Sequence, residues 1–190
     1  FHSIFAKIAL QKCIFSLFLH SHSAFFHYLC SIDNHRNKIM EQLYNTMKVL
    51  LNYTSLSFKR YKFKEIGAHK RMFGIVGPRG VGKTTMILQY IKEHLNISET
   101  LYVSADNMYF STHSLIGLAD RFVKQNGRNL FIDEVHKYKN WSQELKQIYD
   151  TMPELTVGFT GSSVLDIYKG AADLSRRAPI YEMQGLSFRE

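Results

Sequence analysis

One eight-residue segment constrains the fold of this chain more than any other feature. Residues 77–84 read GPRGVGKT and fit the Walker A pattern, G-x-x-x-x-G-K-[ST], at every fixed position. Glycines let such a loop wrap closely around a phosphate, and the loop N–H groups and the N-terminus of the following helix then face the anion. The residues expected to bind the nucleotide are Gly77, Pro78, Arg79, Gly80, Val81, Gly82, Lys83, Thr84 and Thr85.

The segments on both sides of this loop support the same interpretation. A short apolar run at 72–76 precedes the loop, and apolar residues with helical spacing follow it at 86–95. A chance glycine-rich turn would require neither neighbour. In this context Lys83 is expected to reach the β- and γ-phosphates as a catalytic residue, and the Thr84 hydroxyl is expected to ligate Mg²⁺.

Two adjacent carboxylates, Asp133 and Glu134, follow a second apolar run at 129–132. A strand that ends in a carboxylate brings an acid to the magnesium in phosphate-loop folds, so Asp133 is the second predicted metal ligand. Glu134 points elsewhere and is expected to polarise the attacking water. A solvated turn would explain an isolated pair of acids, but the position one strand and one helix after Lys83 favours catalysis. His136 is interpreted as a surface or packing residue.

Two further groups of residues give weaker signals. Ser162 and Ser163 close another strand-like run, where a hydroxyl could sense the γ-phosphate or orient the water. A helix cap ahead of Val164 is an equal alternative. Arg176 and Arg177 are candidates for neutralising charge during phosphoryl transfer, and two surface arginines are the alternative.

Strand-like and helical segments alternate from about residue 40 onwards. Apolar residues have helical spacing at 40–51, 86–95, 115–123 and 141–152, with caps expected from residues 111–114 and from Asn140. Strand-like runs lie at 72–76, 101–104, 130–132, 155–160 and 179–183. Such alternation predicts right-handed βαβ units and a parallel sheet covered on both faces, which is an α/β fold with three αβα layers.

Residues 1–39 differ in composition from the rest of the chain. Residues 1–32 contain no acidic residue, and their most apolar run, 13–19, is too short for a membrane helix or a signal peptide. We interpret residues 1–39 as a non-native or disordered extension translated from upstream sequence, with Met40 as the natural start; a membrane-associating arm is the alternative. Residues 40–70 are expected to form a helix and a basic linker, and residues 71–190 an ATPase core.

The overall composition is that of a soluble globular protein, with 45% hydrophobic and 21% charged residues. A net charge of +8 suits nucleic acid, an anionic membrane or a small anionic ligand, and does not choose among them. Two cysteines without a CxxC pattern favour a reducing, cytoplasmic location. The basic run at 59–64 is either a nucleic-acid contact or a solvated edge, with Tyr61 or Phe63 near the base.

Together these motifs resemble the AAA-type ATPases of bacteria and archaea, a branch of the AAA+ class. The resemblance runs from about residue 40 to the end through GPRGVGKTT, LYVSADNMYF, LFIDEVHKYKNWSQELKQIYD, FTGSSVLDI and DLSRRAPIYEMQGLSFRE. It implies a five-stranded, mostly parallel sheet of AAA+ type, a sensor role near Ser162, and an arginine finger at Arg176 or Arg177 that would act within a homo-oligomer. A helical lid normally follows the GLSFRE segment, so we expect this chain to lack the lid.

The sequence thus predicts a hydrolase that uses ATP and Mg²⁺ to drive a conformational change on a protein or nucleic-acid client. The main alternative is a switch that binds ATP, turns it over slowly and is read by a partner. A GTPase is disfavoured because no N/TKxD motif is found, and an ABC transporter subunit is disfavoured without an LSGGQ-like segment. A small-molecule kinase stays open, although no acceptor-binding motif stands out.

Overall fold

The computed structural model describes residues 38–66, 71–162, 174 and 176–186. The chain divides into two compact units, Phe1–Gln42 and Leu43–Glu190. Residues 38–42 of the first unit and residues 43–53 of the second are helical. The interpretation of residues 1–39 therefore falls almost entirely outside the described residues. No helix in the described ranges is long and apolar enough to cross a membrane.

The second unit is built on a sheet of five parallel strands, as the sequence predicts. The strands are β1 (Met72–Val76), β2 (Thr100–Ser104), β3 (Asn129–Asp133), β4 (Thr156–Gly161) and β5 (Ile180–Glu182). Their order across the sheet is β2-β3-β4-β1-β5, and every neighbouring pair is parallel. The predicted fold class, an α/β fold with a parallel sheet, is confirmed.

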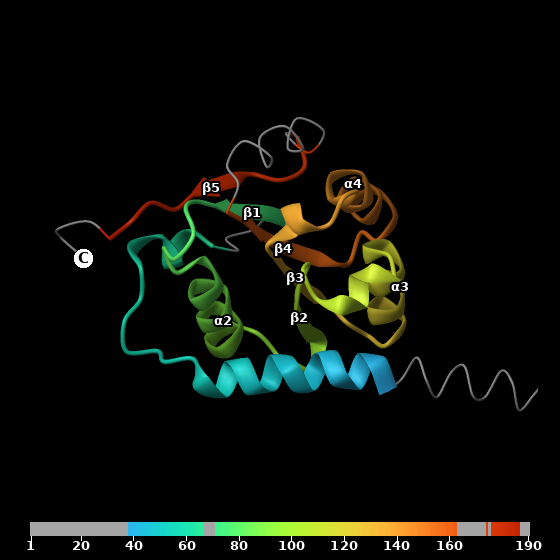
Figure 1. Cartoon of the computed structure of the whole chain (residues 1–190), viewed down its shortest axis with the longest axis horizontal. Helices are drawn as coiled ribbons and strands as arrows, with labels where there is room; N and C mark the ends of the chain where they lie inside the picture. Colours follow the sequence, from blue (N-terminus) through green and yellow to red (C-terminus); the bar gives the residue numbers. More distant parts are fainter. Residues whose placement is uncertain (1–37, 67–70, 163–173, 175, 187–190) are drawn as a thin grey trace, which may run out of the picture. The chain divides into compact units, whose positions relative to one another are not determined.

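Helices cover both faces of this sheet. Helix α2 (Lys83–His94) packs on one face, while α3 (Leu115–Lys124) and α4 (Trp141–Thr151) lie together on the other (Figure 1). The core on the α2 side joins buried residues of the sheet to residues of α2 and of the segments before β1; its members include Met47, Leu51, Phe63, Ile66, Phe73, Ile75, Met86, Ile87, Leu88, Ile91, Tyr102, Phe131 and Met183. Burial of this many apolar side chains is the main stabilising term of such a domain.

Residues 43–53 protect the open side of strand β2. This strand is at the edge of the sheet, where unpaired N–H groups could recruit another chain. The backbone N–H of Tyr102 instead donates to the sulfur of Met47, at 3.2 Å, and Met47 is fully buried. The helical segment before the core is thus part of the packing of the second unit.

The two predicted helix caps have different outcomes. The hydroxyl of Ser114 accepts from the N–H of Gly117 at 3.1 Å and caps α3, as expected. Asn140 stands before α4, but its side chain makes no capping hydrogen bond, so that prediction is wrong. Asn140 has φ −103° and ψ 23°, which is not the extended conformation that points a capping side chain back at the helix.

Parallel strands place their carboxyl ends at one edge of the sheet, so residues that follow different strands can lie close together there. The phosphate loop follows β1, Asp133 ends β3, and Ser162 follows β4, so all three lie at the carboxyl edge. Residues 176 and 177 precede β5 and lie at the opposite edge.

Candidate functional site

The phosphate loop is shaped by its glycines. Gly80 and Gly82 have positive φ angles of 84° and 94°, a conformation in which side chains with a Cβ are strained. Gly82 occupies the N-cap position of α2 and supplies no capping side chain. The first N–H groups of α2 therefore meet no side-chain acceptor at the cap, and with the positive end of the helix dipole they favour an anion.

Lys83 lies inside the loop and holds it together. Its side chain is buried, and Nζ donates to the carbonyl oxygens of Gly77 (2.8 Å) and Pro78 (2.9 Å). Burial lowers the pKa of Lys83, and the negative charges of Glu134 and Asp133 oppose that shift. The lysine that the sequence predicts to bind phosphate is thus already held at the phosphate loop.

Asp133 is the centre of a buried cluster of hydroxyl groups. Its Oδ2 accepts from the hydroxyls of Thr84 (2.6 Å) and Tyr102 (2.7 Å), and its Oδ1 accepts from Thr160. Burial, followed by the charge and hydrogen bond of Asp133, raises the pKa of Tyr102 and keeps this phenol protonated as a donor. The structure therefore brings the two predicted metal ligands together, and adds two residues that sequence reasoning missed.

The Thr84–Asp133 pair fits a magnesium ion by the chemistry of its donors. Mg²⁺ prefers hard oxygen ligands and is usually held by one or two protein groups together with water and phosphate oxygens. A hydroxyl and a carboxylate already in contact at 2.6 Å, beside the phosphate loop, are such a pair.

Glu134 sits next to this cluster in a backbone conformation that is uncommon for a glutamate. Its φ is +52°, and its N–H points to Oδ1 of Asp133 (3.2 Å) and the hydroxyl of Thr160 (3.1 Å). Its carboxylate accepts from the hydroxyl of Ser162 at 2.8 Å, and Nε2 of His136 lies 3.2 Å from the same oxygen. Ser162 and Glu134 are therefore brought together, and His136, interpreted above as a surface or packing residue, contacts the catalytic candidate.

The two arginines lie away from this cluster. Arg177 makes a bidentate ion pair with Asp150, with distances of 2.9 and 3.0 Å, and its guanidinium is 5.8 Å from the ring centre of Tyr149. The same ring packs against Arg71, the residue before β1, which confirms the position at the amino edge. Arg176 is exposed. Neither arginine can reach the phosphate loop of its own chain, and Ser163 lies outside the described residues.

The loop opens into a cavity of about 460 Å³ that could hold the rest of a nucleotide. Besides residues of the loop, its walls come from the start of α2, the segment before β1 and the chain after β5; they include Phe58, Arg60, Thr85, Met86, Gln89, Gly185 and Leu186. Phe58 is fixed at this cavity because the amide of Gln89 donates to its carbonyl oxygen at 2.7 Å.

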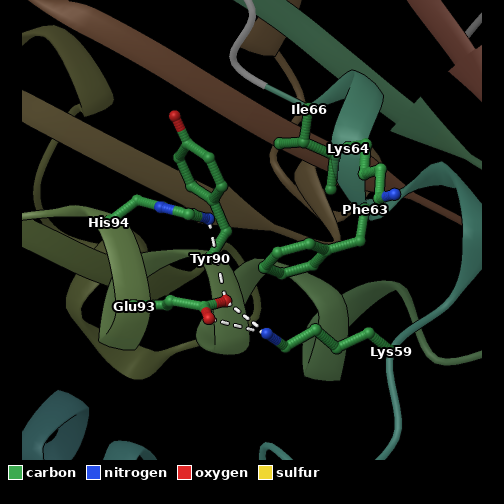
Figure 2. A pocket seen from close by; sticks show the side chains of 7 residues that line it. All are labelled: Lys59, Phe63, Lys64, Ile66, Tyr90, Glu93 and His94. Atoms are coloured by element: carbon green, nitrogen blue, oxygen red, sulfur yellow. Dashed lines mark hydrogen bonds and ion pairs between the residues drawn. The ribbon is translucent and has the colours of Figure 1, made fainter.

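A second cavity, of about 580 Å³, lies beside the C-terminal half of α2. Figure 2 shows Phe63 facing Tyr90 in this cavity, with the ion pair between Lys59 and Glu93 at its edge. Phe63 thus lines the second cavity, whereas Tyr61 lines neither of the two cavities. Both residues belong to the turn η1 (Tyr61–Glu65), which carries the chain past the phosphate loop. The aromatic residue that lines the cavity beside the loop is Phe58, whereas Tyr61 and Phe63 do not line it; which aromatic side chain packs near the base stays a prediction.

Comparisons with known proteins identify similar sequences and a similar fold. A family model described as an AAA domain matches residues 69–190. An uncharacterized protein of Methanocaldococcus jannaschii is 32% identical over 160 residues, which are 77% of this chain and 33% of that relative. The solved Walker-type ATPase of Pyrococcus abyssi is similar in fold, with a TM-score of 0.50 at 14% identity over 67% of this chain and 53% of its own. The chain thus spans about a third of its curated relative and about half of the solved one.

Proposed function

The chain belongs to the AAA domain family, and on this basis we propose that it binds ATP with Mg²⁺ and hydrolyses it to drive a conformational change. The observation that carries the proposal is the contact between Thr84 and Asp133, 2.6 Å long and adjacent to a phosphate loop that already holds a buried lysine. Asp133 at the end of β3 and Thr84 at the start of α2 would together form a site for a metal ion beside the bound phosphate.

Phosphate binding would draw on groups that are already in place. The loop N–H groups and the start of α2 would receive the phosphate oxygens. Lys83 would exchange its bonds to the carbonyls of Gly77 and Pro78 for bonds to a phosphate, a short movement for a flexible side chain. Thr84 and Asp133 would hold the Mg²⁺, which, when bound, would neutralise charge on the phosphate oxygens.

Glu134 is the proposed general base. Its carboxylate would accept a proton from the attacking water, and Ser162 and His136 would position it by their contacts with one carboxylate oxygen. Most of the acceleration would come from positioning and electrostatics, as in other phosphoryl transfers.

An arginine would have to come from a second copy of the chain. Arg176 and Arg177 lie at the edge of the sheet opposite the phosphate loop, so they could act only on a neighbour's nucleotide in a homo-oligomer. Of the two, Arg176 is exposed, whereas Arg177 is paired with Asp150, and Arg176 is therefore our choice.

A slow molecular switch is the second candidate, and the state of Glu134 favours it. One oxygen of this carboxylate is in contact with Ser162 and His136 in the structure. An enzyme whose base is held in this way would hydrolyse ATP slowly until a partner released the base. The two functions are separated by phosphate release from ATP, measured with the full chain in the presence and absence of Mg²⁺. Steady Mg²⁺-dependent release supports the hydrolase; tight binding of ATP without release supports the switch, and absence of both overturns the proposal.

Replacement of Phe58 by alanine is expected to weaken ATP binding about tenfold, because base–aromatic stacking contributes roughly 1–3 kcal/mol. Phe58 is half exposed and lines the cavity together with Met86 and Leu186, as a residue that stacks on a base should. Inorganic triphosphate should bind equally well to both proteins. Tyr61→Ala is the matched control, since Tyr61 is similarly exposed but lines neither cavity. Wild-type affinity in Phe58→Ala would contradict the assignment.

A further inference from the structure

Arg60 is the buried basic residue of the segment 59–64, in which Lys59 and Lys64 are exposed and Lys62 is partly exposed. Only 7% of Arg60 is exposed, whereas Lys59, Tyr61 and Lys64 are exposed. A buried guanidinium is strongly destabilising unless its N–H groups are hydrogen-bonded. Its burial beside the phosphate loop therefore calls for partners, and the structure supplies them.

Arg60 donates to backbone carbonyls from two elements that are far apart in the sequence. Nη1 donates to the carbonyl oxygen of Val81 in the phosphate loop at 2.8 Å. Nη2 donates to the carbonyl oxygens of Gln184 (2.9 Å) and Gly185 (3.1 Å), which follow β5. Figure 1 shows the segment before η1 beside the start of α2 and near the red chain that leaves β5. One planar, permanently charged group thus joins the loop to this chain.

The bond to Val81 has a consequence for the loop N–H groups. The peptide between Val81 and Gly82 is trans and planar, so its C=O and N–H point in opposite directions. With the carbonyl turned towards Arg60, the N–H of Gly82 is turned away from Arg60. Arg60 therefore fixes the orientation of one backbone donor of the loop.

The chain after β5 contacts the phosphate loop at both of its ends. The N–H of Met183 donates to the carbonyl oxygen of Val76 at 2.7 Å, just before the loop. The end of the Met183 side chain lies 3.7 Å from the position that a Cβ on Gly82 would take, at the far end of the loop. Met183 thus contacts both ends of the loop, and Arg60 links the loop to residues 184 and 185 by its hydrogen bonds.

We propose that Arg60 is a positioning residue that couples the phosphate loop to the chain leaving β5, so that nucleotide binding orders residues 184–186. This inference rests on the proposed nucleotide site. The loop would hold the Val81 carbonyl fixed once its N–H groups bind phosphate, and Arg60 would transmit that restraint to the carbonyls of Gln184 and Gly185. Nucleotide state would in this way reach residues 184–186, on the far side of Arg60 from the loop.

The test compares the full chain with Arg60→Gln and Arg60→Lys, and uses Lys59→Gln as the matched control. Lys59 is the neighbouring basic residue, but it pairs with Glu93 at the edge of the second cavity. ATP affinity is measured by titration with a fluorescent ATP analogue. Hydrogen exchange of residues 180–186 is then measured with and without nucleotide, at a concentration that gives every protein the same occupancy.

In wild type and in Lys59→Gln, nucleotide should slow exchange in residues 184–186 by a similar factor. Arg60→Gln should bind ATP about tenfold more weakly or worse, because charge-assisted hydrogen bonds are lost, and should show no slowing at equal occupancy. Arg60→Lys keeps the charge, which preserves folding, but a single ammonium cannot span both elements, so its protection should be partial. Full protection in both Arg60 variants at equal occupancy would overturn the inference, whereas failure of wild type to bind ATP would overturn the proposed function instead.

Discussion

Glu134→Gln should lower the rate of Mg²⁺-dependent ATP turnover by about 10²-fold or more while ATP affinity stays within about twofold of wild type. An amide keeps the size of the carboxylate and can still contact Ser162, but it cannot accept a proton from water. The phosphate loop, Thr84 and Asp133 are unchanged, so binding should survive. Turnover is measured as phosphate release at saturating ATP, and affinity by titration of the same preparation.

Glu154→Gln is the control for this experiment. Glu154 is an exposed glutamate that pairs with Arg128 far from the loop, so its loss should leave turnover unchanged. Turnover equal to wild type in Glu134→Gln would remove Glu134 as the base. Loss of binding together with turnover would show that Glu134 serves the structure of the site, through its contacts with Ser162 and His136, and not the proton transfer.

Gly77→Ala should destabilise the fold by about 3 kcal/mol, the upper part of the usual range for overpacking. A Cβ at position 77 would overlap the backbone carbonyl oxygen of Met183, which cannot move aside without breaking the pairing of Met183 with Val76 at the end of β5. Unfolding in denaturant is followed by the fluorescence of Trp141, the single tryptophan, which is buried against Phe159. The midpoint of the transition should fall.

Gly80→Ala is the matched control within the same loop. No atom lies within 4 Å of a Cβ at position 80, so only its positive φ of 84° is unfavourable, at a cost of about 1–2 kcal/mol. A smaller loss of stability in Gly80→Ala than in Gly77→Ala is expected. Equal losses would mean that strain in the loop backbone, and not packing against the end of β5, sets the need for glycine at position 77.

The fold was predictable from the sequence because its signals are local. Periodicity and cap residues locate most helices and strands, and alternation of the two dictates a parallel sheet. The loop and Asp133 were found for the same reason, since each follows a strand directly in the sequence. The arrangement at the carboxyl edge then follows from parallel pairing alone.

The rest of the site depends on contacts between strands. Tyr102 and Thr160 reach Asp133 because β2 and β4 flank β3, and strand order cannot be read from residue types. His136 meets Glu134 through a left-handed turn that no pattern indicated. Phe58 was missed for a related reason: four aromatic residues lie at positions 53–63, and only the path of η1 decides which one borders the loop.

The central claim is that residues 77–84 and Asp133 form a site for ATP with Mg²⁺. Isothermal titration of the full chain with ATP, in the presence and absence of Mg²⁺, tests this claim most directly when Lys83→Met is titrated alongside. We predict one ATP per chain, tighter binding with Mg²⁺, and a loss of affinity of about tenfold or more in Lys83→Met. Absence of binding by the wild-type chain at about 1 mM ATP, the upper end of ordinary substrate affinities, or equal binding by Lys83→Met, would contradict it.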